Sequence, residues 1–256
     1  LVAGPRAVAG PPEGWVPQAR TAILVTVCGE DPLPVVEHLA DLRRRLDGAG
    51  LGTAVELVVL SDTSAADRLA TEEAAFAPLR RAGTIVYRRR RENTGRKPGN
   101  IAEWFERAGD AFEYMIVLDA DSRMSAERAR ALVWQLERRP RLGLLQAGIA
   151  LVPGRSRFGR HQRTAARLMG GNFGRGLAAW SGDAGNYWGH NAIMRTEAFR
   201  AALRLPDLSG RALLGGSILS HDFVEAAWIR RAGWAVALDP DPAGSAEDAP
   251  QTVEAF

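Results

Sequence analysis

The 256-residue sequence contains one cysteine and one lysine, and each scarcity excludes a kind of chemistry. The lone Cys28 rules out an internal disulfide framework and a cysteine-based zinc site, and it is typical of a reducing compartment. Lys97 is the one lysine among 33 basic residues, and the other 32 are arginines. It lies between Arg96 and Pro98 in the sequence, so the Gly-Lys-Ser/Thr of a phosphate-binding P-loop is absent. A lysine Schiff base or a Ser-x-x-Lys acylase would have to use this same lysine.

Long apolar runs are lacking as well. The longest, Ala22 to Val27 and Tyr114 to Leu118, have the length of strands and fall far short of the roughly 18 apolar residues of a transmembrane helix. We expect no signal peptide in this sequence, because it has no segment with a basic start and an apolar core. No Gly-x-Gly-x-x-Gly follows the first apolar run, which argues against a dinucleotide cofactor. With 46% hydrophobic and 25% charged residues, the composition is typical of a soluble globular domain.

The two ends of the chain differ in composition from its middle. Residues 1–20 open with a stretch rich in Gly, Pro and Ala and are interpreted as a linker, and residues 245–256 as a weakly structured tail. We therefore expect one domain over residues 21–244. Because the chain begins at Leu1 without an initiator Met, we expect it to be a fragment of a longer protein.

Strand-like and helix-like segments alternate over residues 21–244. Strands are predicted at 23–27, 55–60, 84–87, 114–118, 143–152 and 234–238. Helices are predicted at 32–46, in an alanine-rich segment that ends before 83, at 125–139, and from 220 to about 233. This alternation predicts an α/β fold with a mixed, mostly parallel sheet and helices on both faces. In such sheets, ligands bind at the carboxyl ends of the strands.

A pair of aspartates, Asp119 and Asp121, follows the fourth predicted strand. Two carboxylates at this spacing can share a hard divalent cation such as Mg²⁺ or Mn²⁺, with substrate phosphates and water completing the ligand shell. The alternative is that one aspartate forms a turn and the other precedes a helix. Asp-x-Asp alone is common, but the preceding apolar run favours the metal-binding interpretation.

Two other strand ends carry charged residues with a structural and a functional interpretation. Asp62 could bind a base or ribose, as an acidic residue after a second strand does in dinucleotide folds, or it could cap the next helix. The run from Arg88 to Arg91 could form, with Lys97, a cationic surface facing a diphosphate, or it could be a solvated edge.

Two segments later in the chain combine aromatic, small and ionisable residues. In Tyr187-Trp-Gly-His-Asn191, Trp188 could stack on a sugar ring and Gly189 would allow close approach of a ligand. For Trp180, a buried strand aromatic is the preferred interpretation. Asp222 lies in the first turn predicted after Ser220, where the helix dipole keeps a carboxylate ionised for proton abstraction or simply stabilises the helix.

Taken together, these segments resemble the inverting glycosyltransferases of family 2, which have the GT-A (Rossmann-like, nucleotide-sugar-binding) fold. The likeness narrows to the glucans biosynthesis glucosyltransferase H family, which makes osmoregulated periplasmic glucans. It covers about residues 21 to 247. The most distinctive segments are Tyr187-Trp-Gly-His-Asn-Ala-Ile193 and Ile218-Leu-Ser-His-Asp-Phe-Val-Glu-Ala226, joined by Lys97-x-Gly-Asn-Ile101 and Val117-Leu-Asp-Ala-Asp-Ser122.

The resemblance implies a UDP-glucose donor, Mg²⁺ or Mn²⁺, and a growing β-glucan acceptor. It also implies a parent protein in the bacterial inner membrane whose transmembrane helices flank this cytoplasmic domain. Asp222 is implied as the general base and Asp119 and Asp121 as donor and metal ligands. The other implied donor contacts are Thr26, Glu30, Asp62, Lys97, Gly99 and Asn100, and the implied acceptor contacts are Trp188, Gly189 and His190.

The sequence departs from the family pattern in two places. The loop Thr26-Val-Cys-Gly29 stands where relatives usually have Pro-x-Tyr-Asn, and the Gln-x-x-Arg-Trp motif of processive relatives does not occur before Phe256. Alternatives remain a cellulose- or hyaluronan-like synthase, a donor-binding domain that is inactive when excised, and a nucleotide-sugar sensor. A nucleic-acid partner is not expected, since 30 acidic residues nearly balance 33 basic ones.

Overall fold

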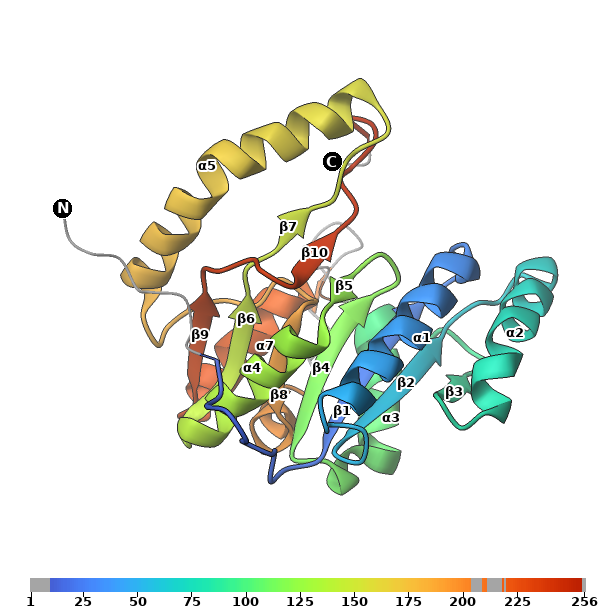
Figure 1. Cartoon of the computed structure of the whole chain (residues 1–256), viewed down its shortest axis with the longest axis horizontal. Helices are drawn as coiled ribbons and strands as arrows, with labels where there is room; N and C mark the ends of the chain where they lie inside the picture. Colours follow the sequence, from blue (N-terminus) through green and yellow to red (C-terminus); the bar gives the residue numbers. More distant parts are fainter. Residues whose placement is uncertain (1–9, 204–208, 211–217, 219, 255–256) are drawn as a thin grey trace.

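A computed structural model describes residues 10–203, 209–210, 218 and 220–254. A seven-stranded sheet forms its centre, in the order β3-β2-β1-β4-β8-β6-β9 (Figure 1). The strands are β1 (Thr21–Val27), β2 (Val55–Ser61), β3 (Val86–Arg89), β4 (Tyr114–Asp119), β6 (Leu142–Ala147), β8 (Ala192–Arg195) and β9 (Ala235–Asp239). Strand β8 runs antiparallel to β4 and β6, while the other pairs are parallel. The predicted mixed, mostly parallel sheet is confirmed.

Helices cover both faces of this sheet. Successive side chains of a strand point to opposite faces, and in β1 the side chains on both faces are apolar and pack against helices. Ile23, Val25 and Val27 of β1 pack with α1, α2 and α4, whereas Ala22 and Leu24 pack with the helices of the other face. The first group of helices is α1 (Pro32–Gly48), α2 (Ala66–Arg81) and α4 (Ala126–Arg138). The second is α3 (Arg96–Ala108), α6 (Thr196–Phe199) and α7 (His221–Arg231), with short 3-10 turns at Gly109–Ala111 and Arg200–Ala202.

A second, three-stranded sheet forms beyond the carboxyl ends of β6 and β9. It consists of β5 (Arg123–Met124), β10 (Ser245–Glu247) and β7 (Ala150–Leu151), with β10 in the middle. The single strand predicted at 143–152 is therefore two strands, β6 and β7, in different sheets. The expectation of a weakly structured tail from residue 245 is wrong for β10, because Ser245 is buried and the strand pairs on both sides.

The start of the described chain is also packed rather than free. The Trp15 ring meets the Trp134 ring of α4 edge-on at 5.4 Å, and the Trp15 carbonyl accepts a hydrogen bond from Arg130 at 2.9 Å. Residues 10–20 therefore lie against α4, which corrects the linker interpretation for this part. Residues 1–9 lie outside the described residues.

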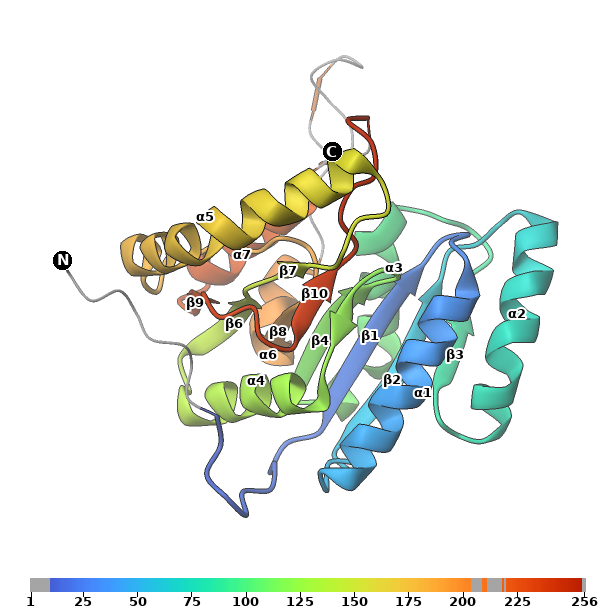
Figure 2. The same ribbon diagram turned by 45° about the horizontal axis from the view of Figure 1, so that its top comes forward.

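The long helix α5 (Arg157–Ser181) lies on the outside of the domain and packs against β7 and β9 (Figures 1 and 2). Trp180, expected to be a buried strand aromatic, is in the last turn of this helix and is 86% exposed, so that prediction is wrong. Among the described residues, no helix is long and apolar enough to cross a membrane.

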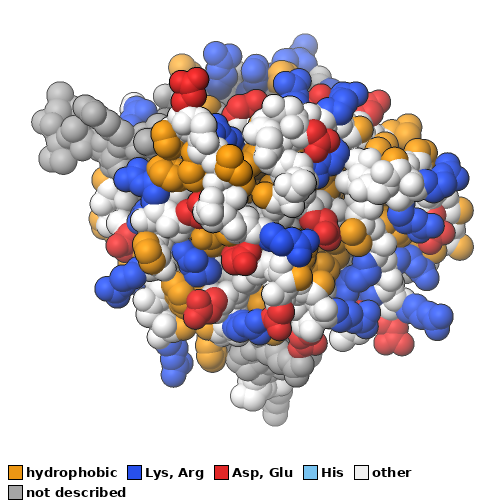
Figure 3. All heavy atoms as spheres, turned by 60° about the horizontal axis from the view of Figure 1, so that its bottom comes forward, with side chains coloured by type: hydrophobic (Ala, Val, Ile, Leu, Met, Phe, Trp, Pro, Cys, Tyr) orange, Lys and Arg blue, Asp and Glu red, His pale blue; other side chains and the backbone are white. Residues whose placement is uncertain are grey.

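Basic and acidic side chains share the surface. On the face that Figure 3 shows, Lys and Arg side chains are interspersed with Asp and Glu over most of the area. This mixture differs from the broad basic surface that tracks a nucleic-acid backbone.

Candidate active site

A cleft of about 640 Å³ opens at the carboxyl ends of β1 and β4. Its lining contains many of the residues expected to bind a donor: Thr26, Val27, Cys28, Glu30, Asp62, Asn93, Arg96, Lys97, Asp119, Ala120 and Asp121. A larger cleft of about 860 Å³ lies at the opposite edge, around Arg141 and Trp234, where the parallel strands begin. Parallel sheets bind ligands at the carboxyl edge, so the smaller cleft is the candidate site.

Strand geometry aims Thr26 and Asp119 into the same cleft. The two residues are direct neighbours in the β1–β4 register, and both fall on the face covered by α3 and α7. The Thr26 hydroxyl donates a hydrogen bond to Asp119 Oδ1 at 3.0 Å, and the Lys97 ammonium pairs with the same oxygen. Lys97 reaches this oxygen from the first turn of α3, so three elements converge on one carboxylate.

On its other side, Lys97 faces the loop before β8 and the start of α7. A Cβ atom added to Gly189 would lie 3.7 Å from Asp222 Oδ2 and 3.8 Å from Lys97 Nζ. Gly189 has φ +89°, and the Tyr187 hydroxyl holds its carbonyl oxygen at 2.6 Å. The backbone at Gly189 is thus fixed beside both charged groups, and Asp119, Lys97 and Asp222 form one continuous constellation.

A further carboxylate beside this constellation, that of Glu225, was not predicted from the sequence. Glu225, one turn after Asp222 on α7, is buried and lies 3.2 Å from His221 Nδ1. Burial raises the pKa of Glu225, and the hydrogen bond from His221 and the charge of Lys97 only partly offset that effect. Its position three residues after Asp222 is the one signal in the sequence that could have pointed to it.

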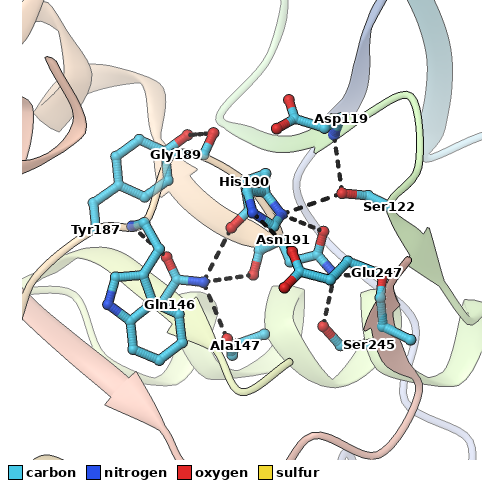
Figure 4. A network of polar contacts seen from close by, with 12 residues as sticks. Asp119, Ser122, Gln146, Ala147, Tyr187, Gly189, His190, Asn191, Ser245 and Glu247 are labelled. Carbon is cyan, nitrogen blue, oxygen red and sulfur yellow. Dashed lines mark hydrogen bonds and ion pairs between the residues drawn. The ribbon is translucent and has the colours of Figure 1, made fainter. Parts of the chain in front are cut away.

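His190 lies behind the turn that carries the two aspartates. Its Nδ1 atom is 3.2 Å from Ser122 Oγ, which in turn accepts a hydrogen bond from the Asp119 backbone N–H at 3.0 Å (Figure 4). Its Nε2 atom faces Glu247 of β10 at 3.2 Å. His190 was expected on the acceptor side, but here it links the carboxylate turn to the second sheet.

The pKa values of two carboxyl groups near His190, those of Asp121 and Glu247, are raised. Although the Asp121 residue as a whole is exposed, desolvation of its carboxyl group and, after it, the nearby Asp119 charge raise the pKa of Asp121, and His190 partly offsets this effect. The pKa of Glu247 is raised for the same reasons, with burial first. An oxygen-binding cation would relieve this repulsion.

The residues fit a metal ion that is shared with a ligand. Among the described residues, no group of three or more His, Cys, Asp or Glu side chains is arranged to hold a metal ion. Asp119 and Asp121 supply hard oxygen donors but an incomplete shell. Mg²⁺ and Mn²⁺ sites of this kind take their remaining ligands from phosphate oxygens and water.

Three residues expected to touch the donor are held by the protein itself. Asp62 is 6% exposed, and both of its carboxylate oxygens accept hydrogen bonds from Arg90, although Asp62 still borders the cleft. Asn100 is buried and accepts hydrogen bonds from Arg88. A Cβ on Gly99 would lie 2.1 Å from the Thr94 carbonyl oxygen, so glycine is needed there for packing.

These contacts also revise the interpretation of the arginine run. Arg90 is buried against Asp62 and the loop carbonyls at Thr94 and Arg96, and Arg88 is turned toward Asn100. Neither guanidinium faces the cleft as part of a cationic surface. The cations that line the cleft are Arg96 and Lys97, the first two residues of α3.

Comparison with known proteins shows the family of the chain. The sequence profile of Glycosyl transferase family 2 matches residues 22–203. The chain belongs to this family. It is 45% identical over 241 residues to glucans biosynthesis glucosyltransferase H of Bradyrhizobium diazoefficiens, covering 93% of this chain and 32% of that protein. It is 42% identical over 238 residues to the same enzyme of Shewanella baltica, covering 91% of this chain and 33% of that protein.

This family 2 chain therefore spans about a third of the length of the relatives that it matches. Among solved structures, it resembles the mannosyltransferase PcManGT of Pyrobaculum calidifontis in complex with GDP-Man and Mn²⁺ (TM-score 0.61, 17% identity, 95% of this chain and 62% of that one). It also resembles TarS 1-349 of S. aureus (TM-score 0.56, 13% identity, 90% and 60%). Similarity at this level concerns the fold, and the predicted GT-A fold is confirmed.

Proposed function

We propose that this chain is the catalytic domain of an inverting glucosyltransferase that transfers glucose from UDP-glucose to a growing β-glucan, the osmoregulated periplasmic glucan backbone. We further propose that it works at the cytoplasmic face of the bacterial inner membrane, next to transmembrane helices of its parent protein and without a nucleic-acid partner. Similarity to glucosyltransferase H supports the reaction class. The observation that carries the proposal is that Lys97 pairs with Asp119 and that Lys97 and Asp222 both lie beside Gly189.

The donor would lie in the cleft at the carboxyl ends of β1 and β4. Thr26, Glu30 and Asp62 line the part expected to face uridine, and Lys97 would bind the diphosphate as a compact positive charge. The complexes of PcManGT with GDP-Man and of TarS with UDP-GlcNAc support a nucleotide-sugar donor, since both proteins share the fold. Gly99 and Asn100 would act indirectly, by holding the start of α3.

Asp119 and Asp121 would hold Mg²⁺ or Mn²⁺ together with the donor diphosphate. When bound, the ion would neutralise charge on the departing UDP. Lys97 would move its ammonium group from Asp119 toward the diphosphate as the donor binds. The Ser122–His190 link would hold the aspartate turn in position.

Asp222 would accept the proton of the acceptor hydroxyl. As that oxygen bonds to the anomeric carbon from one face, the bond to the diphosphate oxygen breaks on the other, and UDP leaves with the electron pair. The position of Asp222 in the first turn of α7 favours the ionised carboxylate that this step needs. Gly189 leaves the space beside its Oδ2 atom open for the acceptor, with Trp188 next to it.

Asp222→Asn in the complete membrane protein tests this assignment. We expect transfer from UDP-glucose to fall by at least about a hundredfold, because general-base catalysis contributes on that order, while UDP affinity stays within about twofold. Asp183→Asn, at an exposed aspartate on the opposite edge of the sheet, is the control. Equal losses of transfer and of UDP affinity in Asp222→Asn would remove Asp222 from the role of base.

A further inference from the structure

Helix α5 carries an unusual share of exposed apolar surface. Nine large hydrophobic side chains are exposed among the described residues, and four of them lie on this helix. These four, Leu168, Met169, Phe173 and Trp180, are 69% to 86% exposed. Because scattered single residues need no explanation but a concentration on one element does, the outer surface of α5 calls for a partner.

The four side chains share one side of the helix. At about 100° per residue, Met169, Phe173 and Trp180 fall within an arc of about 40°, and Leu168 extends the apolar sector to about 140°. The buried residue of this half of the helix, Ala178, lies on a different side, about 160° around the helix from Trp180. Figures 1 and 2 both show α5 along the margin of the domain, and the high exposure of its four apolar side chains means that they are turned away from the sheet.

The same helix is strongly basic. Its 25 residues include five arginines and no aspartate or glutamate. Arg157 and Arg175 lie within about 20° of the Leu168 edge of the apolar sector. The hydrogen bonds of Arg160, Arg163 and Arg175 go to neutral oxygens, so their positive charge is not cancelled within the helix.

We propose that α5 is an interfacial helix that lies against an anionic lipid bilayer. Leu168, Met169, Phe173 and Trp180 would enter the boundary between head groups and acyl chains, and the arginines would reach the lipid phosphates with their long side chains. A second copy of the chain is a poorer occupant, because two-fold packing of α5 on α5 would oppose arginine to arginine. Charge complementarity thus favours the lipid surface.

This contact would also orient the domain. Helix α5 follows β7, which itself follows the carboxyl end of β6, so the helix begins near the edge of the sheet that carries the candidate active site. The helix ends next to Asp183 at the opposite edge, so contact through α5 would fix the orientation of the domain relative to the membrane. The inference goes beyond the membrane location proposed above, because it assigns lipid contact to the domain itself and requires no bound donor.

Sedimentation of the 256-residue chain with vesicles tests the inference. We expect binding to phosphatidylcholine vesicles that contain about one third phosphatidylglycerol, and much weaker binding to phosphatidylcholine alone or at high salt. Phe173→Ser and Trp180→Ser should each weaken binding on the order of tenfold. Val16→Ser, which changes another exposed apolar residue away from α5, should bind as the wild type does.

A charge variant and two controls complete the experiment. Arg157→Gln with Arg175→Gln should weaken binding to the anionic vesicles, whereas Arg80→Gln with Arg81→Gln on α2 should not. All variants should keep the wild-type unfolding temperature and UDP affinity, which separates this test from that of the donor site.

Three results would overturn the inference. The first is no binding of the wild-type chain to the anionic vesicles, and the second is equal weakening by Val16→Ser and Phe173→Ser. The third is a lipid-free dimer that Trp180→Ser dissociates, because the apolar sector would then be covered by a second copy.

Discussion

Gly189→Ala tests whether the space beside Asp222 is used by the substrate. The added methyl group would meet no atom closer than 3.7 Å, so no clash is expected. The backbone angle φ of +89° is unfavourable for alanine by about 1–2 kcal/mol. Alanine also lowers the conformational entropy of the unfolded chain, which stabilises the folded protein by about 0.4–1 kcal/mol. The net destabilisation is therefore about 1 kcal/mol.

The effect on transfer should be larger than this loss of stability suggests. The methyl group would lie 3.7 Å from Asp222 Oδ2 and 3.8 Å from Lys97 Nζ, in the space through which the acceptor hydroxyl would approach the proposed base. Displacing a reacting group by about an ångström commonly costs on the order of a hundredfold in rate. We therefore expect transfer to fall by about that factor, with UDP affinity reduced much less.

Gly233→Ala supplies a matched control for the strain. Gly233 has φ +92° and no atom within 4 Å of an added Cβ, and it lies after α7, away from the cleft. Urea unfolding should give about the same loss of stability for both variants, and glucosyl transfer by the complete protein should separate them. Wild-type transfer by Gly189→Ala, or equal loss of transfer in Gly233→Ala, would refute the reasoning.

Three further predictions concern single side chains. Lys97→Ala should weaken UDP binding roughly 10- to 100-fold in calorimetry, since a charge-assisted hydrogen bond contributes about 1.5–3 kcal/mol; unchanged affinity would return Lys97 to a purely structural role. Arg90→Met should lower the free energy of unfolding by about 3–5 kcal/mol, because it leaves the buried Asp62 carboxylate unpaired, and a loss below about 1 kcal/mol in urea titration would contradict the buried pair. The folded-state pKa of Glu225 is raised above 4.5, so folded Glu225 keeps a proton that the unfolded chain releases, and its contribution to stability falls as the pH rises above about 4.5. Glu225→Gln should flatten that decline in unfolding temperatures measured from about pH 4.5 to 7, and an unchanged slope would exclude Glu225 as its source.

Local patterns predicted the strands and the residues at their ends. The first and fourth strands are apolar on both sides, so alternation within each strand does not by itself show that Thr26 and Asp119 share a face. The β1–β4 register makes them neighbours. The helix beginning at His221 was equally clear, and with it the position of Asp222 in the first turn.

Contacts between residues far apart in the sequence could not be predicted from local sequence patterns. The link from His190 to Glu247 joins residues 57 positions apart in the chain through a strand of three residues, and no local pattern predicts such a pairing. The packing role of Gly99 depends on the Thr94 carbonyl, whose position follows from the loop rather than from residue type.

Helix α5 was missed for a physical reason. Five glycines, at positions 159, 170, 171, 174 and 176, lie within it, and each weakens helix propensity by about 1 kcal/mol relative to alanine. With no helix expected there, Trp180 was assigned to the core by its aromatic character alone. Its exposure instead follows from the outer position of α5 on the domain.

The most direct test of the central claim is calorimetric titration of the chain with UDP and UDP-glucose, with and without Mn²⁺ or Mg²⁺. The proposed site predicts that UDP binds with the metal ion present and less tightly without it, because Asp119 and Asp121 leave part of the ion's shell to the diphosphate. Asp119→Asn with Asp121→Asn should remove the metal dependence. Absence of UDP binding to the folded chain under every condition would contradict the assignment of the cleft between β1 and β4 as a nucleotide-sugar site.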